Sequence, residues 1–288
     1  GLINLWLAKL KGCKVVYNVQ EIYPDILKKK DGLIITLLRK MERYIYDQSS
    51  AITTIDEVFY NTIIGRFKDK SKLHIIPNFV DTELYNPQIK NTVELNPDWF
   101  PQTNSLKLLY AGNIGFAQSW EPLISLACKT KSIPIEYFVV GEGVMKAFIE
   151  SKKQELDLKN VHILPYQPRE VMPNILAYSD IQFIFMNPEM EMQGFPSKVY
   201  TIMSCAKPLL VCSGIDSPIM NFLQNYACAK LVTENDYNKK IDEMYNWLIS
   251  VSKSELLEMG KNGLDIIKKY YSKEVVTKQY VDLVRSLE

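Results

Sequence analysis

The sequence has very little of the material from which metal sites and disulfide frameworks are built. Its 288 residues include 2 histidines and 5 cysteines. The histidines, His74 and His162, lie far apart in the chain, and no two cysteines have Cys-x-x-Cys spacing. We therefore expect neither a metal site nor a disulfide scaffold, and we interpret the cysteines as buried thiols in a reducing compartment.

Long hydrophobic runs are also missing. No apolar stretch approaches the roughly 20 residues that a membrane-spanning helix needs. The opening segment GLINLWLAKL is broken by Lys9 and Lys11 and has no small-residue cleavage site of the kind that follows a signal peptide. We expect a cytoplasmic protein, either soluble or peripheral on the inner face of a membrane.

Charge is nearly balanced over the whole chain but unevenly distributed. The formal net charge is +1, yet residues 1–72 contain 13 Lys and Arg against 8 Asp and Glu. This basic end would suit an acidic partner. It lacks the alternation of aromatic and basic residues found in single-strand binders, so no nucleic-acid partner is expected.

Apolar strand-like runs alternate with helical segments along most of the chain. In the first part, strands are expected at 14–19, 51–55 and 72–78, with helices at 2–12, 33–48 and 57–67. From Leu106 onward, strands are expected at 106–112, 135–141, 161–165, 181–186, 208–212 and 229–232. Such alternation predicts α/β architecture with parallel sheets covered by helices.

The pattern predicts two Rossmann-like, doubly wound domains, the first of them incomplete. We place the first at residues 1–85 and the second at 106–270. Between them, residues 86–105 are rich in Pro and Asn and predict a linker. The last segment, 271–288, is expected to form a helix that packs back on the first domain.

Glycines follow two of the predicted strands directly. They occur in YAGNIG (110–115) and VVGEG (139–143). Ligands of open α/β sheets bind outside the carboxyl ends of the strands, where a missing Cβ lets the backbone approach a phosphate. A plain tight turn is the alternative for each motif.

The stretch QGFPSKVYTIM (193–203) combines turn residues with a single cation at a helix start. Backbone N–H groups at such a start, together with Lys198, would suit an anion. The alternative is an ordinary solvated lysine, in a position that the helix dipole disfavours unless an anion is bound.

Six segments, in this order, resemble a known enzyme family. The sequence is similar to retaining glycosyltransferases of the two-Rossmann (GT-B) type, glycosyltransferase family four, and most similar to enzymes that build capsule, O-antigen and exopolysaccharide units. The resemblance covers nearly the whole chain. The segments are HIIPNFVDTELYNP, LLYAGNIGFAQSWEPLISLA, FVVGEG, NVHILPYQPREVMPNILAYSDI, GFPSKVYTIMSCAKPLLV and MGKNGLDIIKKYYSKEVVTKQYVDLV.

This resemblance implies transfer of a sugar, with retention, from a nucleotide-sugar donor to a glycan or polyprenyl-diphosphate-linked acceptor. The donor is expected to be UDP-linked, with no metal and no cofactor. The second domain would hold the donor and the first the acceptor. As the sugar–phosphate bond breaks, negative charge grows on the diphosphate, so hydrogen-bond donors and cations must be aimed at it.

The resemblance also implies site residues. Catalytic roles are expected for Lys198, Gln193 and Gln20. Recognition of the base is expected to use backbone near residues 163–166. The donor-binding set is expected to comprise Gly112, Asn113, Gly115, Gly141, Pro165, Tyr166, Gly194, Phe195, Pro196, Ser197, Lys198 and Thr201.

Several positions depart from the family pattern. Asn113 and Gln118 stand where many relatives carry Arg and Lys, and Gln193 and Thr201 occupy the positions of the Glu-x7-Glu pair. Thr201 is too short to clamp a ribose as a carboxylate would. The substitutions indicate either an unusual donor or a loss of activity.

In the first domain, Gln20 stands where relatives carry a histidine. Glu21 and Asp25 are further candidates for contact with the acceptor, although Glu21 would equally suit a helix N-terminus. The resemblance implies roughly three more strand–helix units ahead of residue 1. We therefore expect a fragment or half of a split enzyme, whose strand KVVYNV lies at an exposed edge and associates with a partner or with a second copy.

A basic amphipathic segment covers residues 28–43. Its apolar residues Ile34, Leu37, Leu38, Met41 and Ile45 have helical spacing. We expect this stripe to cover the sheet, with contact to anionic lipid as the alternative.

Two other functions remain open at this point. One is a catalytically weak subunit of a split enzyme that binds a nucleotide sugar, which the substituted acidic positions favour. The other is a nucleotide-sugar epimerase, against which the scarcity of histidine argues.

Overall fold

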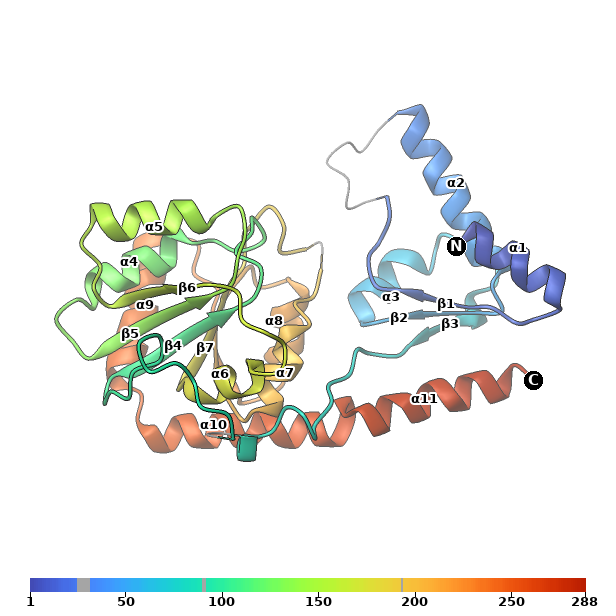
Figure 1. The fold of residues 1–288 in the computed structure, drawn as a ribbon. Helices are drawn as coiled ribbons and strands as arrows, with labels where there is room; N and C mark the ends of the chain where they lie inside the picture. Colours follow the sequence, from blue (N-terminus) through green and yellow to red (C-terminus); the bar gives the residue numbers. More distant parts are fainter. Residues whose placement is uncertain (25–31, 90–91, 193) are drawn as a thin grey trace. The chain divides into compact units, whose positions relative to one another are not determined.

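The computed structural model describes residues 1–24, 32–89, 92–192 and 194–288. The chain divides into two compact units (Figure 1). Unit 1 comprises Gly1–Phe79 and Tyr270–Glu288, and unit 2 comprises Val80–Lys269.

Unit 1 is built on a parallel sheet of β1 (Val16–Val19), β2 (Ala51–Thr54) and β3 (Leu73–Ile75), in the order β1-β2-β3. Its helices are α1 (Leu2–Lys11), α2 (Leu33–Gln48), α3 (Glu57–Ile63) and α11 (Lys273–Ser286). Successive strand residues point to opposite faces. Accordingly, Ile52 packs in a cluster with Tyr46 of α2, whereas Ala51 packs with Val276 and Leu283 of α11.

Unit 2 contains six parallel strands in the order β6-β5-β4-β7-β8-β9. The order reverses between β4 and β7, which is the switch point of a doubly wound sheet. The strands are β4 (Leu106–Ala111), β5 (Ile135–Val140), β6 (Val161–Leu164), β7 (Ile181–Phe185), β8 (Leu209–Cys212) and β9 (Ala229–Val232).

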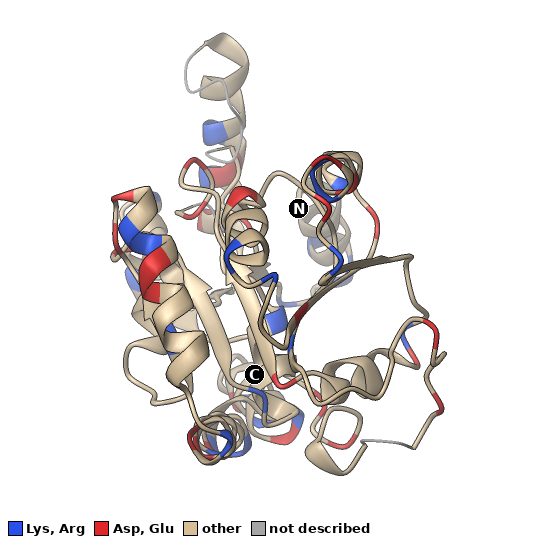
Figure 2. Ribbon diagram, turned by 90° about the vertical axis from the view of Figure 1, so that its left-hand side faces the viewer, with Lys and Arg blue, Asp and Glu red and all other residues tan. Residues whose placement is uncertain are grey.

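Helices cover both faces of this sheet, and a buried cluster lies on each face. Leu123, Ile149 and Met244 from α4, α5 and α9 join one cluster, and Ile175 of α6 joins the other. Figure 2 shows charged residues mainly along helices and loops, with the strands largely uncharged. The helices are α4 (Glu121–Lys129), α5 (Lys146–Glu155), α6 (Met172–Tyr178), α7 (Lys198–Ser204), α8 (Pro218–Leu223), α9 (Tyr237–Ser250) and α10 (Lys253–Ile266).

The predicted α/β class with two parallel sheets is confirmed. The unit boundaries differ from the expected ones, because unit 2 begins at Val80 and includes the whole segment expected as a linker. Phe100 is buried against Phe138 and Tyr178, and the backbone N–H of Val93 donates to Asn174. The Pro and Asn residues indicated turns correctly, but they carry no information on whether those turns pack.

The expectation for the apolar stripe of α2 holds only for Leu38, Met41 and Ile45, which are half-buried. Ile34 and Leu37 are exposed, whereas Ile35 and Tyr46 are the buried residues of this helix. The part of the segment that precedes Gly32 lies outside the described residues.

Membrane-spanning helices were searched for in the described part of the chain. No helix there is both long and apolar enough to cross a bilayer.

Candidate functional site

The candidate site lies at the carboxyl ends of β4 and β5, next to the switch point of the unit 2 sheet. Ligands of such sheets bind at this position. Three segments meet here: the loop after β4, the loop after β5, and the start of α7, which follows β7 in the chain.

The glycines after β4 and β5 allow two loops to touch backbone to backbone. Gly141 has φ 145°, and a Cβ placed on it would lie 2.0 Å from the carbonyl oxygen of Gly112. A Cβ on Gly143 would lie 2.2 Å from the carbonyl oxygen of Ile114. The Gly112 N–H also donates to the Val140 carbonyl at 2.9 Å. Both motifs are therefore more than turns, because no residue with a side chain fits at either contact.

Two aromatic residues hold the loop after β4 in place. The Tyr110 hydroxyl donates to the Asn113 carbonyl at 2.6 Å, and Trp120 Nε1 donates to the Gly115 carbonyl at 3.1 Å. Their rings contact each other edge to face, and Trp120 is almost completely buried. The loop at the candidate site is thus fixed by the core beneath it.

Lys198, the first residue of α7, extends its side chain to this loop. Its Nζ donates to the Ala111 carbonyl at 3.2 Å and lies 3.6 Å from the centroid of the Tyr110 ring. The same nitrogen lies 2.9 Å from where a Cβ of Gly112 would be. The ammonium group therefore lies against the end of β4, and the alternative of a solvated lysine does not hold.

The surroundings of Lys198 disfavour its positive charge. In the part of the chain that the structure describes, Lys198 has no carboxylate partner. Burial lowers the pKa of its ammonium group to about 7. Its described contacts are one carbonyl oxygen and an aromatic face, which attract a cation without neutralising it. A bound anion would supply the missing negative charge.

Two of the residues expected around α7, Phe195 and Thr201, have structural contacts. Phe195 packs on Tyr200 and Phe222, and the Thr201 hydroxyl donates to the Lys198 carbonyl within its own helix. Ser197 is exposed, and Gly194 has open space where a Cβ would be.

The expected residues after β6 also lie near the loop after β5. The Tyr166 side chain is exposed, while its backbone N–H binds the Glu142 carboxylate and helps to lower the pKa of Glu142, after the larger effect of Lys146. The Pro165 carbonyl accepts from Gln167 at 3.1 Å.

For four expected residues, the site roles stay predictions. Gln20 and Glu21 belong to unit 1, where Gln20 Nε2 donates to Asn18 Oδ1 at 3.0 Å. Gln193 and Asp25 lie outside the described residues, so their expected roles stay predictions.

Gln118, to which sequence analysis assigned no role, has a structural one. It is buried, and its Oε1 accepts from the backbone N–H of Phe185 at 3.1 Å. It therefore joins the β4–α4 loop to the end of β7 and offers no side chain to a ligand. The sequence could not predict this, because the residue type alone does not show whether a Gln in a glycine-rich loop points inward or outward.

Sequence analysis did not assign a role to Glu191. Its Oε2 accepts from the Gly214 N–H at 2.6 Å and from Ser213 Oγ at 3.0 Å. A Cβ on Gly214 would lie 2.3 Å from this carboxylate. Glu191 thus ties the segment leading to Lys198 to the loop after β8. In the sequence, the signal available for this role was the position of Glu191 as the last acidic residue before QGFPSK.

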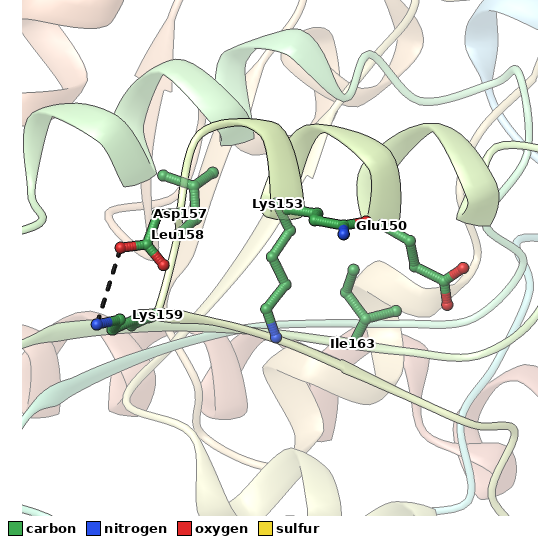
Figure 3. Close-up of a pocket in the computed structure, with 7 residues that line it drawn as sticks. Glu150, Lys153, Asp157, Leu158, Lys159 and Ile163 are labelled. Carbon is green, nitrogen blue, oxygen red and sulfur yellow. Dashed lines mark ion pairs between the residues drawn. The ribbon is translucent and has the colours of Figure 1, made fainter.

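A separate cavity of about 440 Å³ lies beside α5 and β6 (Figure 3). Lys153 and Lys159 line it together with Glu150 and Asp157, so its charges balance. Lys159 pairs with Asp157 at 3.8 Å. Neither Lys198 nor the glycine loops line this cavity, and we assign it no part in the candidate site.

Comparisons with known proteins agree on one enzyme family. Residues 94–263 match the family model "Glycosyl transferases group 1". The chain is 26% identical over 212 residues to "Putative colanic acid biosynthesis glycosyl transferase WcaI" of Escherichia coli (strain K12), covering 69% of this chain and 51% of that protein. It is 21% identical to "Probable glycosyltransferase WbjE" of Pseudomonas aeruginosa, covering 96% of this chain and 69% of that protein.

Among solved structures, the fold resembles Anabaena Alr3699/HepE in complex with UDP and glucose. The TM-score is 0.74 at 14% identity, with 99% of this chain and 75% of the other covered. This likeness establishes the two-unit α/β fold of GT-B glycosyltransferases. The chain spans about half the length of the Escherichia coli relative. The family model covers more than half of the chain, which therefore belongs to the glycosyl transferases group 1 family.

Proposed function

We propose that the chain binds a nucleotide-diphosphate sugar, UDP-linked, and transfers the sugar with retention to a glycan or lipid-linked acceptor. The pathway would be the synthesis of a surface polysaccharide, and the chain would belong to glycosyltransferase family four. A relative named for colanic acid biosynthesis supports the pathway. A structural neighbour that binds UDP and glucose supports the donor.

One observation carries the proposal: the Lys198 ammonium group, which has no carboxylate partner among the described residues, lies against a glycine loop at the end of β4. A diphosphate bound at this loop would contact Lys198 and the backbone of the loop glycines, which no Cβ shields. As the bond between the sugar and the diphosphate breaks, negative charge develops on the leaving phosphate. A protonated Lys198 would stabilise that charge without reorganising, and this is how preorganised groups lower a barrier.

The test is calorimetric titration of the protein and of Lys198→Met with UDP and with uridine. A hydrogen bond to a charged group contributes about 1.5–3 kcal/mol, so we expect the variant to bind UDP roughly 10- to 100-fold more weakly. Uridine, which lacks the phosphates, should bind both proteins equally. The matched control is Lys152→Met, a half-exposed residue of α5 that pairs with Glu155. Equal UDP affinity of Lys198→Met and the parent protein would remove Lys198 from the site.

A second candidate function is a nucleotide-sugar-binding subunit with little transferase activity of its own. Thr201 favours it, because its hydroxyl is bonded within α7 where the family pattern has a carboxylate. This candidate predicts UDP binding without release of UDP from a UDP-sugar, with or without acceptor glycans. Turnover of a UDP-sugar by the purified chain would contradict it.

A further inference from the structure

Tyr110 contacts both parts of the candidate site from beneath. It belongs to β4 and is almost completely buried. Its hydroxyl donates to the Asn113 carbonyl at 2.6 Å, and the centroid of its ring lies 3.6 Å from Lys198 Nζ. One side chain therefore touches the glycine loop as well as the ammonium group, the two elements that the proposed donor site combines.

The Tyr110 ring is held in this position by the core of unit 2. It meets the Trp120 ring edge to face, with 5.0 Å between centroids, and the Phe183 ring lies 5.9 Å away. Trp120 is itself buried and donates to the Gly115 carbonyl. The ring face that Lys198 contacts is thus fixed in the absence of a ligand.

The Tyr110 ring is one of two described groups that favour the charged form of Lys198. The other is the Ala111 carbonyl oxygen, 3.2 Å from Nζ. The electron-rich face of an aromatic ring attracts a cation more strongly where water is excluded. Burial raises the pKa of the Tyr110 hydroxyl above its ordinary value, so this hydroxyl stays a hydrogen-bond donor near neutral pH.

The carboxylates of the adjoining loops have other partners. Glu142, in the loop after β5, pairs with Lys146 at 2.7 Å. Glu191, in the segment before α7, binds the loop after β8, and Glu189 of the same segment is exposed. Helices α7 and α8 contain no acidic residue. Among the described residues, the contact that can offset the burial of the Lys198 charge therefore comes mainly from the ring.

We propose that Tyr110 is a positioning residue of the donor site with two separate actions. Its ring keeps Lys198 protonated near neutral pH, and its hydroxyl holds the glycine loop that the diphosphate would contact. This inference rests on the proposed function, because it concerns the same lysine and the same loop. The alternative is that Tyr110 only fills the core, as Phe183 does beside it.

The first test measures the pKa of Lys198 directly by nuclear magnetic resonance. In protein isotope-labelled at lysine Cε, the resonance that Lys198→Met removes is followed through a pH titration. The parent protein and Tyr110→Phe should both titrate at about 7. Tyr110→Leu should titrate about one unit lower, because the ring no longer favours the charged form. Phe183→Leu, which removes a buried ring from the same cluster, is the matched control and should leave the titration unchanged.

The second test follows UDP affinity with pH. Tyr110→Phe and Tyr110→Leu both lack the hydroxyl, so a comparison of the two isolates the ring. A pKa lowered by one unit leaves Lys198 less often protonated, so Tyr110→Leu should bind UDP about twofold more weakly than Tyr110→Phe at pH 6 and roughly tenfold more weakly at pH 8. The ionisation of UDP itself is the same for both variants and cancels in this ratio.

The hydroxyl is tested by the comparison of Tyr110→Phe with the parent protein. Its loss leaves the Asn113 carbonyl without this donor, so UDP should bind severalfold more weakly at pH 6 and pH 8 alike. Hydrogen exchange in residues 112–115 should be faster in Tyr110→Phe than in the parent protein or in Phe183→Leu. Unchanged exchange in this loop would remove the action assigned to the hydroxyl.

The outcomes separate this inference from the proposed function. Equal pKa values of Lys198 in Tyr110→Leu and Tyr110→Phe, with a ratio of UDP affinities that does not vary with pH, would reduce the ring to packing while Lys198 stays in the donor site. If the parent protein binds UDP no better than uridine, the proposed function fails, and the titration of Lys198 still decides whether the ring holds the charge. Tyr110→Met, a larger ringless variant, replaces Tyr110→Leu if circular dichroism shows that the latter does not fold.

Discussion

At the scale of single residues, Lys198 links the pH dependence of stability to the candidate site. Burial lowers the pKa of its ammonium group from 10.5 to about 7 in the folded chain. Between these values the unfolded chain binds the proton and the folded chain releases it, so raising the pH stabilises the fold across this window. Below about pH 7 both the folded and the unfolded chain hold the proton, so the buried charge destabilises the fold to its full extent.

The first prediction follows from this rise of stability with pH. Lys198→Met removes the buried charge and should raise the midpoint of thermal unfolding, by more at pH 6 than at pH 9. Differential scanning calorimetry at the two pH values measures the difference. Lys152→Met, whose lysine is half-exposed and paired with Glu155, should show no such pH-dependent gain. An equal rise of the unfolding midpoint at both pH values would show that burial does not disfavour the charged form of Lys198.

A second residue-scale prediction concerns Gly141. Alanine at this position would bring a Cβ to 2.0 Å from the Gly112 carbonyl oxygen at φ 145°. We expect Gly141→Ala to lower the free energy of unfolding by about 2–4 kcal/mol, since overpacking and an unfavourable φ each cost about 1–3 kcal/mol. Urea unfolding measures the change. Gly65→Ala, where nothing lies within 4 Å, should stay within about 0.5 kcal/mol of the parent protein.

Sequence and structure differ in an instructive way at this scale. Lys198 and the glycines could be located from sequence, because strand ends and turn residues define where they must lie. The inward orientation of Gln118 and the contacts of Glu191 could not, since each depends on a partner more than twenty residues away in the chain.

At the scale of secondary-structure elements, Glu191 holds the segment between β7 and α7. Its carboxylate accepts hydrogen bonds from Gly214 and Ser213 of the β8–α8 loop. Ser213 Oγ also lies 2.9 Å from Ser217 Oγ, and Ser217 caps α8. The segment that delivers Lys198 is thereby fixed to the neighbouring loop of the same sheet edge.

The third prediction is that Glu191→Ala loosens this segment. Losing hydrogen bonds to a charged acceptor should lower the free energy of unfolding by about 1–3 kcal/mol and reduce UDP affinity severalfold, because Lys198 is then less well positioned. Limited proteolysis should cut within residues 187–197 faster than in the parent protein. Glu170→Ala, in an exposed loop, is the control. Unchanged proteolysis would show that Glu191 does not restrain the segment.

Helix α2 shows what periodicity can and cannot establish. The helix itself was predictable from spacing over residues 33–48. The choice of buried side was not, because two apolar stripes compete on this helix. The stripe through Ile35 and Tyr46 meets the unit 1 core, while the stripe through Ile34 and Leu37 remains outside it.

At the scale of the whole molecule, strand–helix alternation was sufficient to predict the α/β class and both parallel sheets. Right-handed crossovers then restrict the strand orders that such a chain can adopt. The alternation of strands and helices does not show at which residue a unit begins. Val80 starts unit 2 because residues such as Phe100, ahead of the first strand, are buried against its sheet.

The last prediction separates the two units by their response to a nucleotide. Lys198, the glycine loops and Glu191 all belong to unit 2. At 100 times its dissociation constant, UDP should stabilise the native state by about 2.7 kcal/mol. Hydrogen exchange should slow in residues 110–115, 139–145 and 194–204, while β1, β2 and β3 of unit 1 should exchange at the same rate with and without UDP. Lys198→Met should lose this protection at the same UDP concentration, and Lys152→Met should keep it. Slower exchange around Gln20 and Glu21, with none at the glycine loops, would instead place the nucleotide on unit 1 and contradict the proposed donor site.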